Sequence, residues 1–477
     1  MRENCTSGSV RGAPRNWRSY RKSYSVMILS LLIGSIQALG APSAPPVTER
    51  PNFLFLLADD MRWDALGAAG NAIIQTPNLD RLAAQGISFD NAFVTTAICA
   101  VSRASIFSGQ YARRHGIHDF ATSFTASAWS QTYPTHLRAA GYRTGFIGKF
   151  GVGANHMAEW FDYWDGFMDQ GHYFEPNDAT HLSQKMGDSA LRFLAGADGR
   201  PWALSISFKA PHAQDGAARE FAPDSREELL YQNTTFPEPP TLSEESFRHL
   251  PSFVQTSEGR LRWQRRFATP PQRNQTIRDY YRLITGMDRE IGRLLQQLEE
   301  TGMARNTIVL FSSDNGFFLG EHGLADKWLM YEESIRVPLI LVDPRQPPRL
   351  RGRHINAMAL NLDLAPTLLD YAGVPAPQRM QGRSLRPWAE EHPPADWRSD
   401  WFYEHHFSTG VSIPASEGVR EECWKYIRYT SADPVVEQLV DLCRDPWEQY
   451  DLVSDGRYAD HLARLRARWA ALRDELR

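Results

Sequence analysis

Short apolar runs alternate with amphipathic stretches along most of the chain. The run at 52–57 is continuous, as is typical of a buried parallel strand, and residues 146–147, 203–208, 308–311 and 339–342 indicate further buried strands. Apolar residues that recur every three or four positions indicate helices at 79–84, 135–140 and 277–298. This alternation predicts an α/β fold with a largely parallel sheet flanked by helices.

Two regions depart from the alternation. Residues 213–275 contain several prolines and are expected to form a long surface excursion. After Pro387, short strand-like segments at 425–429 and 437–442 precede a final amphipathic helix, which predicts a small domain with an antiparallel sheet and a helix. We therefore expect a main domain at residues 51–387 and a C-terminal subdomain at residues 388–477.

The N-terminus has the order of segments found in a secretory signal. Five basic residues lie between positions 11 and 22, an apolar run covers 26–36, and small residues follow at 38–41. We expect a signal peptide at residues 1–40, a linker at 41–50, and a secreted or periplasmic protein. The apolar run is shorter than a bilayer span, so no stable membrane insertion is expected, and an uncleaved anchor is the alternative.

Composition limits the classes of function that the chain can have. The chain has 477 residues, its hydrophobic content of 42% is ample for a packed enzyme, and its net charge of -4 offers no basic surface for nucleic acid. Of its four cysteines, Cys5 lies in the predicted signal. Cys423 and Cys443 form a bridge or remain two buried thiols, and both alternatives stay open. Cys99 is left over and requires another explanation.

Candidate chemistry lies where predicted strands end. Asp59 and Asp60 follow the first strand, and Asp314 and Asn315 follow a later one. Singly, such residues are usual in turns, but the carboxyl ends of parallel strands meet at one edge of a sheet, so two acid-rich ends predict a shared site. Their oxygen ligands suit Ca²⁺ or Mg²⁺ and not zinc. Cys99 opens a helix-like stretch, but a thiolate phosphatase would need an arginine at position 105, which is a serine.

An ordered set of motifs resembles the type I, formylglycine-dependent sulfatase family of the alkaline-phosphatase superfamily. The sharpest is Cys-Ala-Val-Ser-Arg at 99–103 with Ser108 and Gly109, which is similar to the family's signature for converting cysteine to formylglycine. The resemblance runs from residue 50 to about residue 452. Its other segments are Leu-Ala-Asp-Asp at 57–60, Gly-Lys at 148–149, Ala-Pro-His at 210–212, Ser-Asp-Asn-Gly at 313–316, Gly-Glu-His-Gly at 320–323 with Lys327, and the stretches 363–370 and 382–385.

The resemblance implies an alkaline-phosphatase-like fold and a sulfuric ester hydrolase that acts on a sulfated glycan or an aryl sulfate. It implies formylglycine at Cys99, one Ca²⁺ per chain, and a formylglycine-generating or maturase enzyme as a partner. Arg103 would orient the metal-side carboxylates, and His212 would bind the sulfate group or protonate the leaving alcohol. Lys149 and Lys327 would bind the sulfate. The implied metal ligands are Asp59, Asp60, Cys99, Asp314 and Asn315.

Two positions depart from the family's pattern. Val101 stands where the family usually has proline or alanine, and Gly151 stands where it often has a histidine two residues after the lysine. His156 is the nearest histidine that would replace it. Two other functions therefore stay open: a phosphodiester or phosphonate monoester hydrolase of the same superfamily, and a catalytically inactive glycan-binding homologue.

The C-terminal region also carries a resemblance. Residues 401–407 and 412–420 are similar to segments of bacterial glycan sulfatases, some of which act on 6-sulfated glucosamine. Several aromatic and polar residues are candidates for lining a sugar pocket, although aromatic residues are more often part of the core. These candidates are Trp160, Trp164, His172, Tyr173, Glu404 and His405.

Overall fold

The computed structural model describes residues 50–407 and 410–477, and these belong to one compact unit. The predicted signal peptide at 1–40 and nearly all of the predicted linker lie outside the described residues. The boundary expected at residue 387 stays a prediction. Within the described ranges, no helix combines the length and apolar character that a membrane span requires.

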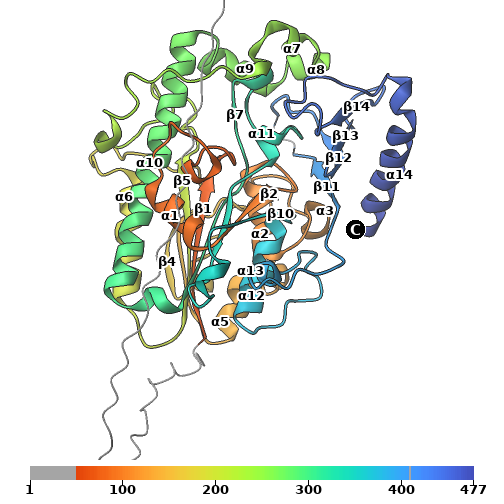
Figure 1. Ribbon diagram of the computed structural model, residues 1–477. Coiled ribbons are helices and arrows are strands. Elements are labelled where there is room, and N and C mark those ends of the chain that lie inside the picture. The colour runs from red at the N-terminus through yellow and green to blue at the C-terminus, as the bar shows by residue number, and fades with distance from the viewer. Residues whose placement is uncertain (1–49, 408–409) are drawn as a thin grey trace, which may run out of the picture. The chain divides into compact units, whose positions relative to one another are not determined.

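An eight-stranded sheet forms the centre of the molecule (Figure 1). Its strands lie in the order β10-β2-β9-β6-β1-β5-β3-β4, and every pairing is parallel except those of β9 with β2 and β6. The largely parallel sheet is therefore confirmed. The strands are β1 (Asn52–Asp59), β2 (Ile87–Phe93), β3 (Arg143–Lys149), β4 (Tyr163–Phe167), β5 (Trp202–Pro211), β6 (Thr307–Ser313), β9 (Leu339–Val342) and β10 (Arg353–Leu360).

Helices cover both faces of this sheet because alternate residues of the central strands point to opposite sides. Leu54 and Leu56 of β1 pack in one core with α1 (Pro77–Gln85), α6 (Leu182–Ala195) and α10 (Pro270–Glu300). Phe53 and Phe55 pack in the other core with α2 (Cys99–Ser108), α5 (Tyr133–Ala139) and α12 (Leu364–Tyr371). Shorter helices are α3 (Ala112–His115), α4 (Ala126–Trp129), α11 (Glu332–Ile335) and α13 (Arg386–Ala389).

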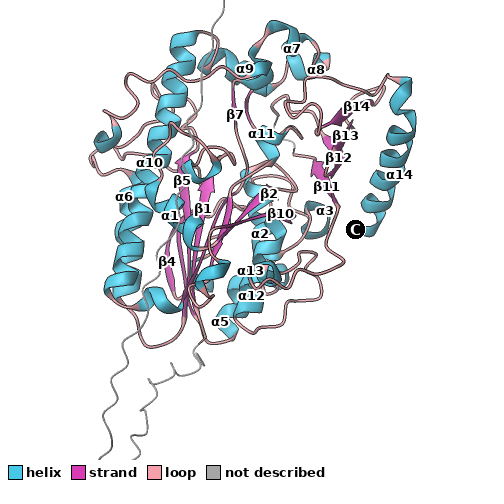
Figure 2. Cartoon of the chain, viewed as in Figure 1, coloured by secondary structure: helices cyan, strands magenta, loops and turns pink. Residues whose placement is uncertain are grey.

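The C-terminal segment forms a second, antiparallel sheet with a helix against it (Figure 2). Its strands are adjacent in sequence order: β11 (Asp400–His405), β12 (Ser416–Glu421), β13 (Trp424–Tyr429) and β14 (Val436–Asp441). The final helix, α14 (Ala459–Glu475), buries Leu462, Leu465 and Leu472, as its apolar spacing predicts. Cys423 and Cys443 form a disulfide at the shared end of β13 and β14, so the bridged alternative is correct.

The expected excursion at 213–275 is wrong in two respects. Phe221 and Phe236 are buried in the core, and the segment contains α7 (Glu244–Arg248), α8 (Ser252–Gln255) and α9 (Glu258–Arg266). Its last residues belong to α10, where Thr269 caps the helix and two prolines occupy the first turn. Proline is tolerated there because the first N–H groups of a helix have no intrahelical partner.

Three strands of the sheet were not predicted, namely β2, β4 and β10. β4 and β10 form the two edges of the sheet, and β2 lies next to β10. All three interrupt their apolar residues with polar ones that are partly exposed, so none presents a continuous apolar run. A two-stranded ribbon, β7 (Phe318–Leu319) with β8 (Ala325–Asp326), lies outside the main sheet and leads directly to Lys327.

Candidate active site

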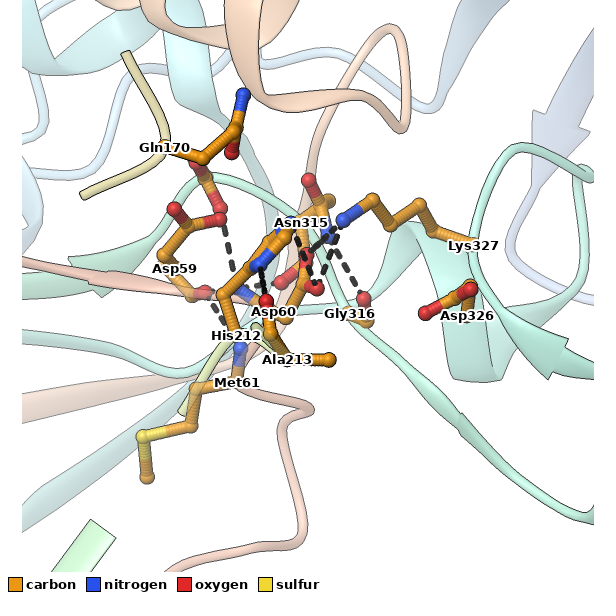
Figure 3. Close-up of polar contacts among 12 residues, drawn as sticks. Asp59, Asp60, Met61, Gln170, His212, Ala213, Asn315, Gly316, Asp326 and Lys327 are labelled. Carbon is orange, nitrogen blue, oxygen red and sulfur yellow. Dashed lines mark hydrogen bonds and ion pairs between the residues drawn. The ribbon is translucent and has the colours of Figure 1, made fainter. Parts of the chain in front are cut away.

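The predicted site residues lie at the carboxyl ends of the strands, and Figure 3 shows five of them together: Asp59, Asp60, His212, Asn315 and Lys327. Parallel strands end at the same edge, so their last residues meet although they are distant in sequence. Asp59 is the last residue of β1, Lys149 is the last of β3, and His212 directly follows β5. Asp314 and Asn315 follow β6, Cys99 and Arg103 lie on the first turns of α2, and Lys327 follows β8.

The backbone at Asp60 turns this carboxylate into the site. Its φ of 71° lies in the left-handed region that few residues other than glycine adopt. Two hydrogen bonds hold the turn: Asp60 N donates to Asp314 Oδ1 at 3.2 Å, and Tyr280 Oη donates to Asp60 O at 2.7 Å. Backbone strain of this kind persists where surrounding contacts enforce it. Tyr280 of α10 therefore helps to position a site residue, although sequence alone indicated only its place in a helix.

Each buried carboxylate has a cationic partner. Lys149 Nζ lies 2.6 Å from Asp59 Oδ2, and Lys327 Nζ lies 2.6 and 2.7 Å from the two oxygens of Asp60. Arg103 Nε lies 2.8 Å from Asp314 Oδ2, and Arg103 Nη2 lies 3.4 Å from Asp59 Oδ2. Arg103 Nη1 also donates to Lys149 O and to Ser207 Oγ. These bonds fix the arginine as a bridge between two strand ends, and all the side chains involved are buried.

The electrostatics of this cluster favour an additional cation. The cationic neighbours, with Lys149 first among them, lower the pKa of Asp59 although burial opposes the shift. Burial raises the pKa of Asp60 to about 7 and that of Asp314 to about 6, and the charge of Asp59 adds to both shifts. Repulsion among three carboxylates this close adds to burial in raising these two pKa values, although each carboxylate has a cationic partner. A bound metal ion would lower both pKa values.

Unpaired oxygen atoms support the same conclusion. Asp59 Oδ1 and Asn315 Oδ1 are buried without a hydrogen-bond partner, which is costly unless another ligand takes them. One ligand atom each from Asp59, Asp60 and His212 also lie within 4.8 Å of one another. The residues present therefore fit a hard metal ion. His212 belongs to this group, although sequence reasoning placed it only among the catalytic residues.

Cys99, the first residue of α2, is a free thiol with 1% exposure. Burial raises its pKa, with Asp59 and Asp314 adding to the rise and Lys149 and Lys327 opposing it. The unmodified side chain is therefore a poor thiolate nucleophile at neutral pH, which agrees with the rejection of a direct thiol mechanism. Val101 is buried in the same apolar cluster as Cys99, together with Ile98, Ala112, Trp328 and Phe407.

His212 has a defined tautomer in the free protein. Its Nδ1 atom lies 2.5 Å from Ala213 O, and a carbonyl only accepts, so Nδ1 is the donor. Burial, followed by the charge of Lys327, lowers the pKa of the ring well below its ordinary value. The neutral ring therefore leaves Nε2, which lies 3.7 Å from Asp60 Oδ2, as an acceptor. To protonate a leaving alcohol, His212 would first have to take up a second proton.

The structure explains why residue 151 is a glycine, but it does not connect His156 with the site. Gly151 has a φ of +70°, and a Cβ at this position would lie 3.2 Å from Arg103 Cδ and 3.5 Å from Lys149 Cε. A side chain would therefore press on two site residues. His156 is exposed and packs beside Trp164, with ring centroids 6.0 Å apart. None of the hydrogen bonds or ion pairs among the described residues joins it to the site.

The candidates for a sugar pocket have mainly structural contacts. Trp164 stacks on Phe146, Glu404 pairs with Arg113 at 3.0 Å, and His405 is fully buried. Trp160 packs against the core. Tyr173 is buried, and its hydroxyl donates to His212 O at 2.6 Å, so it supports the loop that carries His212. His172 is exposed.

Sequence reasoning missed two side chains near the lysines of the site. Gln170 Oε1 accepts from Lys149 Nζ at 2.6 Å, and Asp326 is paired at 2.7 Å with Arg266 and at 2.8 Å with Arg262 beside Lys327 (Figure 3). Asp326 carried a weak signal, because it directly precedes Lys327 in sequence. Gln170 carried none, since a single glutamine in a polar loop has no distinguishing pattern.

Known proteins share both the sequence and this architecture. A family model described as "Sulfatase" matches residues 51–374, and one described as "N-sulphoglucosamine sulphohydrolase, C-terminal" matches residues 320–475. The chain is 32% identical to an N-acetylglucosamine-6-O-sulfatase of Bacteroides thetaiotaomicron, over 92% of this chain and 87% of that protein.

Solved structures give the same result. A protein in complex with its substrate D-glucosamine-2-N,6-O-disulfate superposes with a TM-score of 0.77 and 30% identity, over 90% of this chain and 98% of that one. A phosphonate monoester hydrolase of Agrobacterium radiobacter shares the fold, with a TM-score of 0.76 and 22% identity, over 90% of this chain and 96% of that one. The extent of the family match and the identity to a sulfatase over most of both chains show that this chain belongs to the sulfatase family, whose members hydrolyse sulfate esters.

Proposed function

We propose that this sulfatase carries formylglycine at Cys99, binds one Ca²⁺, and removes the 6-O-sulfate from a glucosamine-containing glycan. One observation carries the proposal: Cys99 is buried next to the charged cluster, near enough that the charges of Lys149, Asp59, Lys327 and Asp314 act on its thiol. Oxygen ligands from Asp59, Asp60, Asp314 and Asn315 suit Ca²⁺, because it takes six to eight such ligands in flexible geometry.

The two added groups have separate tasks. Ca²⁺ would withdraw negative charge from the sulfate oxygens and lower the pKa of a hydroxyl beside it. Formylglycine would supply that hydroxyl in its hydrated form, which an ordinary cysteine lacks. The metal ligands are held for these tasks by Arg103, which bridges Asp59 and Asp314 and cannot lose its proton.

The cationic side chains of the chain would bind and orient the sulfate. Lys149 and Lys327 each have three donors, and their carboxylate partners leave donors available for sulfate oxygens. Their positive charges act most strongly as negative charge builds up during the reaction, because they are fixed in a buried site. His212 would accept or share a proton at Nε2, since Nδ1 is engaged with Ala213 O.

The mass of the peptide that contains Cys99 tests the first part of the proposal. Conversion to formylglycine replaces sulfur and two hydrogens by one oxygen, so the peptide becomes lighter than its cysteine form. The matured protein should then release sulfate from 6-O-sulfated N-acetylglucosamine, lose this activity in a chelator, and regain it with Ca²⁺. A cysteine that stays unmodified in an active enzyme would contradict the proposal.

The choice of substrate is supported by the relatives. The bacterial relative with 32% identity is an N-acetylglucosamine-6-O-sulfatase, and the solved protein with 30% identity holds D-glucosamine-2-N,6-O-disulfate. Glucosamine sulfated only at O6, only at N2, or at both positions forms a matched substrate series. Turnover confined to the compounds with a 6-O-sulfate is the expected result. Parallel assays with a phosphodiester and a phosphonate monoester test the alternative activity.

We also propose that the chain is exported and that a maturase converts Cys99 beforehand. The Cys423–Cys443 disulfide supports an oxidising compartment, where such bonds persist. N-terminal sequencing of the protein recovered outside the cytoplasm should begin near residue 41. Expression with and without a formylglycine-generating enzyme should change the fraction of converted Cys99. A full-length N-terminus on the mature protein would contradict export by signal cleavage.

A further inference from the structure

The ammonium of Lys149 has one donor that no described residue uses. The side chain is fully buried, and its Nζ atom donates to Asp59 Oδ2 and to Gln170 Oε1, each at 2.6 Å. A lysine ammonium has three donors, so one remains for an external acceptor. The third N–H diverges from both of these oxygens, because the ammonium nitrogen is tetrahedral, and it is available to an oxygen of a bound anion.

Gln170 reaches this lysine from the edge of the sheet. β3 and β4 are parallel neighbours in which Lys149 is paired with Phe167, so Gln170 follows that pairing by three residues. Asp169 Oδ1 accepts a hydrogen bond from Gly171 N at 3.0 Å, which turns the chain at Gln170. This turn brings the glutamine side chain back over the buried lysine, although the residue itself is exposed.

The two ends of the Gln170 amide face different surroundings. An ammonium only donates, so the atom against Lys149 is the carbonyl oxygen. The amide nitrogen then lies on the opposite side, directed away from Asp59 in Figure 3, and no described residue accepts a hydrogen bond from it. Because the residue is exposed, this nitrogen presents its N–H donors on the solvent side of the site.

We propose that Gln170 is a positioning and specificity residue for the sulfate group. Its oxygen fixes the direction of the Lys149 ammonium, and its nitrogen donates to an oxygen of the same sulfate. The inference rests on the proposed function, in which Lys149 binds the sulfate of the substrate.

Charge explains why a glutamine suits this position. Lys149 already faces the carboxylate of Asp59, so it has one negative partner. A second carboxylate at position 170 would offset the remaining positive potential of the ammonium and would repel an incoming anion directly. A neutral amide orients the lysine without either effect. Glutamate at this position is therefore the most informative replacement, because it keeps the shape and changes only charge and donors.

Two variants of the matured, full-length enzyme separate charge from hydrogen bonding. For Gln170→Glu, we expect the KM for a 6-O-sulfated amino sugar and the inhibition constant of inorganic sulfate to rise together, on the order of a hundredfold. For Gln170→Leu, which removes hydrogen bonds to charged partners without adding a charge, both constants should rise on the order of tenfold. Inhibition by the desulfated sugar should stay unchanged in both variants, because that ligand makes no sulfate contact.

Asn177→Asp is the matched control, since it adds the same charge at an exposed position of the same segment. It should leave both constants within about twofold, because none of the hydrogen bonds among the described residues joins Asn177 to Lys149 and its added charge is screened by solvent. Unchanged sulfate inhibition in Gln170→Glu, beside a wild type that hydrolyses sulfate esters, would overturn the role of Gln170 alone. A fall in kcat without a change in KM or sulfate inhibition would overturn it as well. A converted wild type that neither hydrolyses sulfate esters nor binds inorganic sulfate would overturn the proposed function and this inference together.

Discussion

Replacing Lys327 with methionine removes the cation that holds Asp60. Lys327 Nζ lies 2.6 and 2.7 Å from the two oxygens of Asp60, and both side chains are buried. Burial raises the pKa of Asp60 to about 7 even though Lys327 opposes the rise. Without the lysine, the carboxylate must remain charged and unpaired or take up a proton. In a chelator, the free energy of unfolding should therefore fall by about 3–5 kcal/mol.

Calcium should reverse most of this loss. In the variant, a divalent cation among Asp59, Asp60 and Asp314 supplies the positive charge that the lysine supplied in the wild type. The bound cation is also no longer repelled by the lysine ammonium. In the wild type, Ca²⁺ at about a thousandfold excess over its Kd adds about 4 kcal/mol to the free energy of unfolding. In Lys327→Met, the increment should be larger by roughly 2–4 kcal/mol, because one buried like charge is gone. Urea unfolding followed by tryptophan fluorescence, with chelator or with Ca²⁺, measures both increments.

Lys425 provides a matched control within the same chain. It is also fully buried, and its Nζ lies 2.9 Å from Glu332 Oε1 and 2.7 Å from Glu448 Oε1. Lys425→Met should lose a similar free energy of unfolding, but its Ca²⁺ increment should equal that of the wild type. Equal rescue of both variants by Ca²⁺, or rescue of neither, would refute the assignment of Asp60 to a calcium site.

Four further outcomes are expected. Cys99→Ser should abolish turnover in an aerobic host while thermal unfolding stays near that of the wild type; activity above background, with serine verified by mass, would count against formylglycine. Asp314→Ala should reduce kcat by orders of magnitude and weaken the rescue of chelated enzyme by Ca²⁺, measured as the half-saturating Ca²⁺ concentration. Gly151→His should impair turnover far more than His156→Ala, because only the former presses on Arg103 and Lys149; equal effects would contradict the geometry. His405 is buried and neutral, because burial lowers its pKa from the ordinary value of about 6.5 to about 3. At a pH below about 6.5 the ring gains a proton when the protein unfolds, so the protein loses stability as the pH falls. His405→Phe should accordingly stabilise the protein by about 2 kcal/mol more near pH 5 than near pH 8, as measured by urea unfolding at both values.

The central strands could be predicted because each carries its own signal. β1, β6 and β9 are buried on both faces, so apolar residues follow one another along most of each strand, and this signal needs no knowledge of the neighbours. β5 is also buried throughout, and only two serines and a lysine interrupt its apolar residues. The edge strands β4 and β10 are only partly covered, and their polar residues break the pattern. Their existence depends on pairing with a neighbour, which is a property of the fold and not of the local sequence.

The sequence identified the main site residues but not the residues that position them. Asp59, Lys149 and Asp314 occupy strand ends, and their ordered motifs stand out in the sequence. Gln170 and Tyr280 act through single contacts from a polar loop and a long helix. Such contacts follow from three-dimensional proximity only. The prediction for residues 213–275 was wrong because prolines usually mark loops, whereas the last two prolines of this segment occupy the first turn of a capped helix.

Charge balance links the fold to the chemistry of this edge of the sheet. Asp59, Asp60 and Asp314 carry three negative charges when ionised, and Arg103, Lys149 and Lys327 carry three positive ones, so the side chains alone sum to zero. A neutral sum limits the cost of burying six ionic groups, since each charge has a partner within the cluster. A bound divalent cation would make the cluster positive by two charges in a buried region, where Coulomb interactions are strong. The same arrangement that allows these residues to be buried would thus attract the monoanionic sulfate ester to the metal-bound site, and a neutral partner such as Gln170 would preserve that attraction.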